Sequence, residues 1–243
     1  HKIAFLFLVY ERINHEDIWA RFFSHDNQDR HSIYVHYKDR FESKYFNNCK
    51  LPHCVETKWG DISLVRAQNL LLSHAINDPD NKMFIFCSNS CIPFKTFDHV
   101  YQSLNVRYSY FNMAPDTESF PRCNNALKYI DVKYIKKASQ WCILNRKHAK
   151  LILGSDNYLQ WFNDTVGDEH CYITYMHYIG QRDELIVTNN ASNLATTFTN
   201  WSNNKYMYQS PVVSSKIKRN QGIKNYTSIS TEEIKYLFDS KCL

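Results

Sequence analysis

Two adjacent acidic residues and a histidine, Asp168-Glu169-His170, are the residues of this sequence best suited to acid–base chemistry. They follow Gly167 and precede an apolar, helix-like run over residues 171–179. A carboxylate at such a helix start can act as a general base at the lip of a pocket. The competing interpretation is structural, because the partial positive charge of a helix N-terminus stabilises acidic side chains in the first turn.

The elements that must position these residues alternate between strands and helices. Short apolar runs predict buried strands at residues 3–10, 32–37 and 82–87. Apolar residues at helical spacing predict helices starting near residue 14 and at residue 63. This order indicates a parallel sheet wound with helices. Further along, the expected strands are 108–112, 138–144, 184–188 and 196–201, and the expected helices are 97–104, 146–153, 158–162 and 231–238.

Polar segments follow the first three expected strands, at the sheet edge where α/β proteins bind ligands. They are Tyr10-Glu11-Arg12, His36-Tyr37-Lys38 and Ser88-Asn89-Ser90. No Gly-x-Gly-x-x-Gly motif or Walker loop is present, which disfavours a Rossmann dehydrogenase or a P-loop enzyme.

The composition is that of a globular protein with a weakly basic surface. Hydrophobic residues make up 44% and aromatic residues 15% of the 243 residues, which excludes disorder. The net charge of +5 fits an anionic ligand such as a nucleotide diphosphate, and the scattered basic residues disfavour nucleic acid. The eight cysteines lack zinc-ligand spacing, and their disulfide state stays open. The longest apolar run is too short to span a membrane.

A family resemblance appears at Phe84-Ile-Phe-Cys-Ser-Asn-Ser-Cys-Ile-Pro-Phe94, which is similar to the F-I-x-L-S-x-S-C-I-P-L segment of the core-2/I-branching glycosyltransferase family, including its plant branch. The segment from Val55 through Trp59-Gly60 to Val65 resembles the V-x-x-x-W-G-x-x-S-x-V block. Asp168-Glu169-His170 resembles the element P-D-E-H/Y, with Gly167 in place of proline. The other similar segments, in the family's order, are residues 3–8, 22–36, 136–149 and 199–202.

The resemblance implies an α/β fold of the GT-A type, with a mostly parallel Rossmann-like sheet flanked by helices. It implies one catalytic domain over residues 1–243, with a nucleotide-binding half at about 1–110 and an acceptor-binding half at about 111–243. The implied activity is inverting transfer of N-acetylglucosamine from a UDP-sugar to a glycan hydroxyl; a xylosyltransferase-like enzyme is the alternative. The family's general base maps onto Glu169, which leaves Asp168 as the helix cap.

The resemblance also assigns the substrate contacts and implies that no metal cofactor is used. Metal-independent members hold the leaving diphosphate with C-terminal cations, and fixed positive charge can replace a metal there. The candidates for those cations are Lys216, Lys218, Arg219 and Lys224. The expected nucleotide-sugar contacts at the strand ends are Val9, Tyr10, Glu11, Ser88 and His36, which replaces the family's Asp. The expected acceptor contacts are Asp116, Glu118, Arg122 and Trp201.

Alternatives remain open for the function and for single residues. A non-catalytic glycan- or nucleotide-sugar-binding protein with the same fold is favoured by His36 at the family's Asp position. We expect Trp59 and Trp141 in the core and Lys136-Lys137 as a solvated pair. The resemblance implies the Golgi lumen, whereas the Asn-, Lys- and Tyr-rich composition fits a microbe or virus, where the enzyme would be cytoplasmic.

Overall fold

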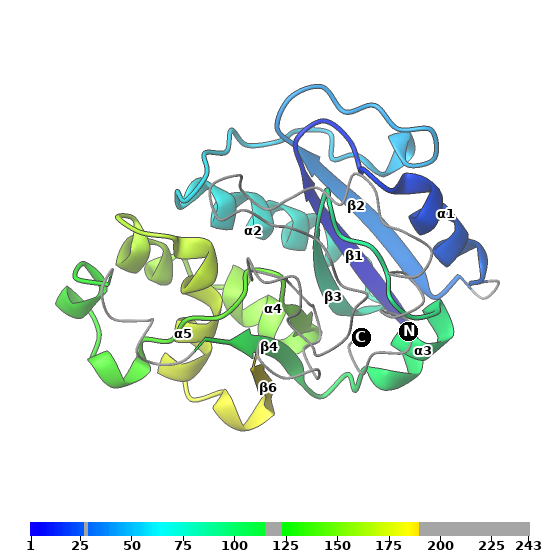
Figure 1. The fold of residues 1–243 in the computed structure, drawn as a ribbon. Coiled ribbons are helices and arrows are strands. Elements are labelled where there is room, and N and C mark those ends of the chain that lie inside the picture. The colour runs from blue at the N-terminus through cyan, green and yellow to red at the C-terminus, as the bar shows by residue number, and fades with distance from the viewer. Residues whose placement is uncertain (27–28, 115–122, 190–243) are drawn as a thin grey trace, which may run out of the picture.

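The computed structural model describes residues 1–26, 29–114 and 123–189 (Figure 1). Within these residues, six strands form one sheet in the order β2-β1-β3-β5-β4-β6. The strands are β1 (Lys2–Val9), β2 (His31–Tyr37), β3 (Asn81–Ser88), β4 (Ser109–Met113), β5 (Ile143–Asn145) and β6 (Leu185–Asn189).

The sheet is mixed but mostly parallel. Strand β1 runs parallel to β2 and β3, with Ile3 opposite His31 and Val9 opposite Tyr37. Strand β5 is antiparallel to both β3 and β4, and β6 is parallel to β4. All strands of this sheet except β5 therefore have their carboxyl ends at one edge, which is called the carboxyl edge below. The predicted fold class, a mostly parallel α/β sheet flanked by helices, is confirmed.

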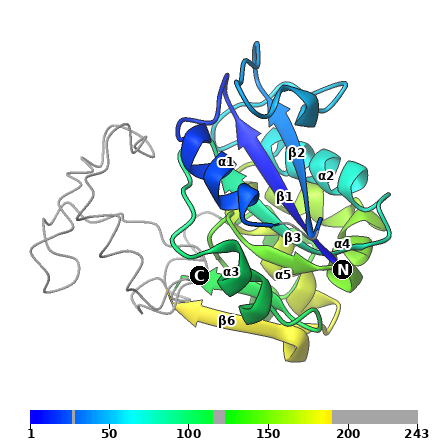
Figure 2. The ribbon, with the colours of Figure 1, turned by 90° about the vertical axis from the view of Figure 1, so that its right-hand side faces the viewer.

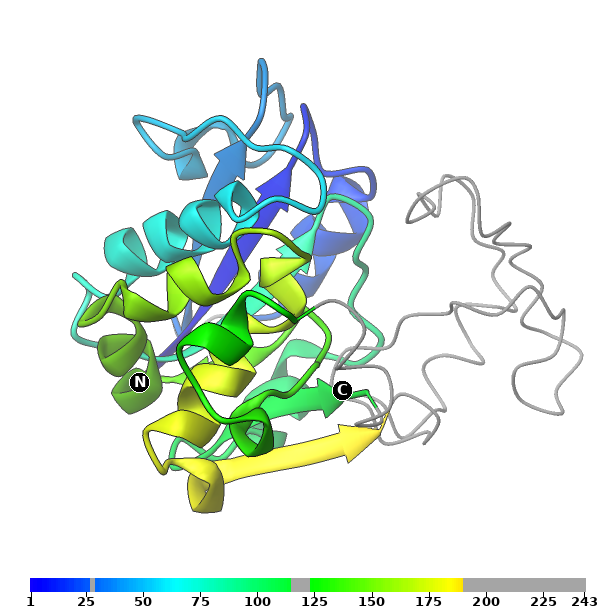
Figure 3. The same ribbon diagram turned by 90° about the vertical axis from the view of Figure 1, so that its left-hand side faces the viewer.

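Helices cover both faces of the sheet because side chains alternate between the faces along each strand. Helices α1 (Glu16–Ser24) and α3 (Phe97–Ser103) lie on one face, as Figure 2 shows. Helices α2 (Ser63–Ala75), α4 (Arg146–Leu153) and α5 (Cys171–Tyr178) lie on the other, which faces the viewer in Figure 3. The first core contains Phe5, Phe7, Trp19, Phe22 and Phe97, and the second contains Leu6, Phe84, Phe86, Leu71, Ile152 and Met176.

The expected strand at residues 138–144 is wrong in extent, because only Ile143–Asn145 forms a strand there. The carbonyl of Gln140 accepts from the side chain of Gln68 at 3.2 Å, and the backbone N–H of Trp141 donates to Ser139 Oγ at 3.3 Å. A backbone group that is hydrogen-bonded to a side chain is not available to pair with a neighbouring strand. The segment therefore makes only an isolated bridge, between Ala138 and Met113, and bends at Gln140 before β5 begins.

The remaining predicted elements between residues 1 and 189 are confirmed to within two residues at most ends. The predicted strand at 196–201 and helix at 231–238 lie outside the described residues. Of the cysteines, the seven that the structure describes are all free thiols. In the same part of the chain, every helix is too short or too polar to cross a membrane.

Candidate active site

The loops that follow β1, β2 and β3 are tied together at the carboxyl edge. The N–H of Lys38 donates to the carbonyls of Val9 and Tyr10, at 3.1 and 3.0 Å. The N–H of Asn14 donates to the carbonyl of Asn89 at 2.8 Å. The structure thus brings the predicted contacts Val9, Tyr10 and Glu11 to the same edge as the end of β3.

Tyr10 and Glu11 are exposed there, whereas Val9 is buried. The ring of Tyr10 is 55% exposed, and the ammonium of Lys38 lies 5.7 Å from its centroid. An exposed ring beside a cation can stack on a planar base and attract a phosphate. An exposed ring and a cation therefore lie together at this corner of the edge.

His36 and Ser88, two further predicted contacts, are buried and support the loops. The Nε2 of His36 accepts a hydrogen bond from the N–H of Val55 at 3.0 Å. Burial lowers the pKa of His36 to about 4, so that its ring is neutral at pH 7. The Oγ of Ser88 accepts from the N–H of Ser90 at 3.1 Å. Both side chains therefore fix loop geometry at the strand ends.

Glu169 ends a 3-10 turn, Gly167–Glu169, that leads into α5. Its carbonyl accepts from the N–H of Ala138 at 2.8 Å, and its Oε2 lies 3.4 Å from Nζ of Lys137. The carbonyl of Lys137 in turn accepts from the N–H of Ala114, directly after β4, at 2.9 Å. Glu169 is therefore anchored beside the end of β4, at the carboxyl edge, with its side chain 28% exposed.

Lys137 is a partner of Glu169 that the sequence did not indicate. The prediction of a solvated Lys136-Lys137 pair is wrong for Lys137, whose side chain is only 23% exposed and ion-paired with Glu169. The two partners are far apart in the sequence, and the ladder contacts of residues 137–138 bring them together. Local residue spacing in the sequence does not indicate an ion pair between residues that are so far apart.

The prediction that Asp168 caps the helix is also wrong. Neither the 3-10 turn nor α5 has a side-chain hydrogen bond at its N-cap. The Oδ1 of Asp168 is buried without a hydrogen-bond partner among the described residues. Burial, and then the neighbouring charge of Glu169, raises the pKa of Asp168 to about 7. The two acids therefore differ: Asp168 is partly buried, with a shielded Oδ1 and a raised pKa, whereas Glu169 is partly accessible and ion-paired with Lys137.

Gly167, where the family usually has proline, is explained by crowding. A Cβ at this position would lie 2.8 Å from Cδ1 of Ile62 and 3.2 Å from the carbonyl oxygen of Phe162. The N–H of Gly167 also donates to the carbonyl of Thr165 at 2.8 Å, a bond that proline lacks. The turn before Glu169 is thus packed tightly against the start of α2.

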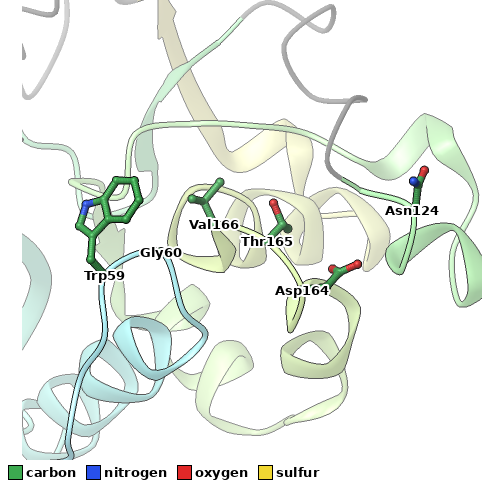
Figure 4. A pocket seen from close by; sticks show the side chains of 6 residues that line it. All are labelled: Trp59, Gly60, Asn124, Asp164, Thr165 and Val166. Carbon is green, nitrogen blue, oxygen red and sulfur yellow. The ribbon is translucent and has the colours of Figure 1, made fainter. Parts of the chain in front are cut away.

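A pocket with a volume of about 400 Å³ opens beside this turn (Figure 4). Trp59, expected in the core, is 77% exposed and lines the pocket, whereas Trp141 is buried as expected. Gly60 and Asp61 follow Trp59, and such turn-forming residues are the signal that could have indicated an exposed ring. The lining residues are Trp59, Gly60, Asn124, Asp164, Thr165 and Val166.

The other predicted site residues lie outside the described residues. These are the expected acceptor contacts Asp116, Glu118, Arg122 and Trp201 and the expected cations Lys216, Lys218, Arg219 and Lys224.

The chain belongs to the Core-2/I-Branching enzyme family, whose model matches residues 3–235. It is similar to Glycosyltransferase BC10 of rice, Oryza sativa subsp. japonica, with 32% identity over 178 residues. That match covers 70% of this chain and 43% of the rice protein, so the chain spans less than half the length of this relative. The family resemblance, with its plant-like branch, is confirmed.

Proposed function

We propose that this chain is a glycosyltransferase that moves a sugar, most favourably N-acetylglucosamine, from a UDP-sugar to a glycan hydroxyl with inversion, and that Glu169 is its general base. The observation that supports this role most directly is the placement of Glu169. Its backbone is fixed to Ala138, its carboxylate is oriented by Lys137, and 28% of its side chain is open to solvent. A base needs this combination of rigid support and access.

The proposed reaction is a single displacement at the anomeric carbon. The acceptor oxygen forms a bond to that carbon while the bond to the UDP oxygen breaks on the opposite side, which inverts the configuration. Glu169 takes the proton of the acceptor hydroxyl and later returns it to water. Lys137 offers the carboxylate a fixed cation at 3.4 Å, which limits the rotamers that the base can adopt.

We place the donor against the exposed Tyr10, Glu11 and Lys38 in the half of the chain before about residue 110. The proposed cations for the departing diphosphate are Lys218, Arg219 and Lys224, which would act in place of a metal ion. The proposed acceptor contacts remain Asp116, Glu118, Arg122 and Trp201. If the cations act in this way, transfer continues in EDTA, and its loss in EDTA with recovery on adding Mn²⁺ would refute that part.

The test of the base compares Glu169→Gln with Glu184→Gln. Glu184 is a matched control because its side chain is also 28% exposed and is ion-paired, with Lys147 at 2.7 Å. We expect Glu169→Gln to reduce turnover about 10²- to 10⁴-fold and Glu184→Gln to leave it intact. Both variants should bind UDP as the unmodified protein does in calorimetry. Full turnover by Glu169→Gln would remove Glu169 from the role of base.

The donor is assigned by the same assay with UDP-N-acetylglucosamine and UDP-xylose offered separately. Release of UDP from UDP-N-acetylglucosamine supports the main proposal. Release of UDP from UDP-xylose alone supports the xylosyltransferase-like alternative.

A non-catalytic sugar-binding protein is the second candidate, and His36 favours it. At the strand end where the family has a carboxylate, this chain has a buried, neutral imidazole whose Nε2 is already bonded to Val55. That end of the site therefore lacks an acidic acceptor for the uracil N–H. Titration with UDP separates the candidates, because the enzyme must bind UDP and a protein that binds only glycans need not.

A further inference from the structure

Trp59 is held by a rigid turn although its ring is exposed. The N–H of Lys58 donates to Ser63 Oγ at 3.0 Å, and the N–H of Ser63 donates to Asp61 Oδ1 at 2.8 Å. The N–H of Asp61 donates back to the carbonyl of Lys58 at 3.2 Å, which closes the turn. Gly60 has a φ of +70°, a conformation that other residues rarely adopt. The chain therefore fixes the backbone that presents a large apolar ring to water.

The opposite wall of the pocket is also held in place by hydrogen bonds. The amide of Asn125 donates to the carbonyl of Gln160 at 2.7 Å and to Oδ1 of Asn163 at 2.9 Å. These bonds join the loop of Asn124 to the loop of Asp164, and both of those side chains are exposed. Figure 4 shows the indole of Trp59 at one end of the pocket and the amide of Asn124 at the other.

Thr165 and Val166 lie between these two walls. The Oγ1 of Thr165 is buried without a hydrogen-bond partner among the described residues. A buried hydroxyl with unused hydrogen-bonding capacity is costly unless a ligand or water satisfies it. Val166 packs against the Trp59 turn, since a Cβ on Gly60 would lie 3.7 Å from its Cγ1.

We infer that this pocket is a subsite for a neutral sugar ring of the acceptor glycan. An exposed indole offers a flat apolar surface to the C–H face of a sugar, and the Asn124 amide, the Asp164 carboxylate and the Thr165 hydroxyl offer hydrogen bonds to its hydroxyl groups. None of the six lining residues is basic and one is acidic, which disfavours a diphosphate here. The volume of about 400 Å³ is within the range of about 300–1,000 Å³ for small-molecule sites.

The position of the pocket favours the acceptor over the donor. Val166 directly precedes the Gly167–Glu169 turn, so a ring stacked on Trp59 lies against the segment that carries the proposed base. The acceptor role rests on the proposed function, whereas binding of a sugar at this pocket does not. The two can therefore be tested separately.

The experiment measures binding of neutral oligosaccharides by saturation-transfer NMR and calorimetry. The probes are N-acetyllactosamine, chitobiose, cellobiose and xylobiose, each offered to the unmodified chain and to its variants. We expect at least one probe to bind, Trp59→Ala to weaken binding roughly tenfold or more, and Trp59→Phe to retain most of it. Thr165→Val, which removes the hydroxyl at constant shape, should weaken binding severalfold.

Tyr45→Ala is the control, because Tyr45 is 45% exposed and is not among the lining residues. The inference is overturned if no probe binds the unmodified chain, or if Trp59→Ala and Tyr45→Ala bind the probes equally well. UDP binding by the unmodified chain is measured in parallel. If the unmodified chain binds a sugar probe but not UDP, the proposed UDP-sugar donor is refuted and the sugar subsite is not. If it binds UDP but no sugar probe, the sugar subsite is refuted and the donor is not.

Discussion

Asp168 makes the stability of this protein depend on pH in a way that one substitution can test. The pKa of its carboxyl is raised from an ordinary 3.8 to about 7, mainly by burial. Between these two pH values the native state holds a proton that the unfolded chain releases. The free energy of unfolding contributed by Asp168 is therefore fully present below about pH 4 and is lost as the pH rises through 7.

The magnitude follows from the difference of about 3 in pKa. Each pKa unit corresponds to about 1.4 kcal/mol, so the full effect is about 4 kcal/mol between pH 4 and pH 8. The side chain is not completely buried, and solvent screening lowers the expected effect to about 2–4 kcal/mol. Asp168→Asn keeps the shape of the protonated acid and removes the ionisation. The variant should therefore exceed the stability of the unmodified protein by a larger margin at pH 8 than at pH 5, where only part of the effect is present.

The assay is urea denaturation at pH 5 and pH 8, followed by circular dichroism. Asp164→Asn is the control, because Asp164 is an exposed carboxylate in the same loop and substitutions at exposed positions usually change stability little. The reasoning fails if Asp168→Asn changes stability equally at pH 5 and pH 8, or if it destabilises the protein more at pH 8.

Three further predictions concern the same edge of the sheet. Gly167→Ala should lower the free energy of unfolding by about 1–3 kcal/mol, since its Cβ meets Ile62 and the Phe162 carbonyl; an unchanged urea midpoint would contradict the crowding. Lys137→Met should reduce turnover about tenfold while Lys137→Arg retains most of it, and equal rates for both would show that the ion pair does not position Glu169. Hydrogen bonds, first from Cys87 and then from Ser88, lower the pKa of Cys91 to about 7. The rate at which iodoacetamide modifies Cys91, followed by mass spectrometry, should therefore rise with pH with a midpoint near 7, and a midpoint above 9 would refute this.

The first part of the fold could be predicted because its signals are local. The strands around Phe5 and Phe84 are short apolar runs, and Trp19, Phe22 and Phe23 recur at helical spacing on α1. The place of β5 could not be predicted, since three residues pair with two strands that are distant in the sequence. Pairing of that kind depends on tertiary context more than on propensity.

The candidate site divides in the same way. The position of Glu169 at the start of a helix and that of Tyr10 at the end of a strand could be predicted, because both follow from local sequence signals. The ion pair of Lys137 could not be predicted, because a lysine beside another lysine is most often solvated. The exposure of Trp59 is indicated only by the turn-forming Gly60-Asp61 that follows it, against the usual burial of large aromatic residues. The folded chain shows that Lys137 is paired with Glu169 and that Trp59 is exposed in the pocket.

The antiparallel strand β5 has a consequence for the order in which the parts of the sheet fold. Strands β1 to β3 and helices α1 and α2 lie within the first 88 residues, so they can associate through contacts that are near in sequence. β4 and β6 make a second parallel pair, and β5 is the seam that joins the two. The Ala138–Glu169 bond lies next to that seam. We therefore expect the part of the carboxyl edge that holds Glu169 to form last in folding, and pulse-labelling hydrogen exchange should show late protection of Ala138 and early protection of β1.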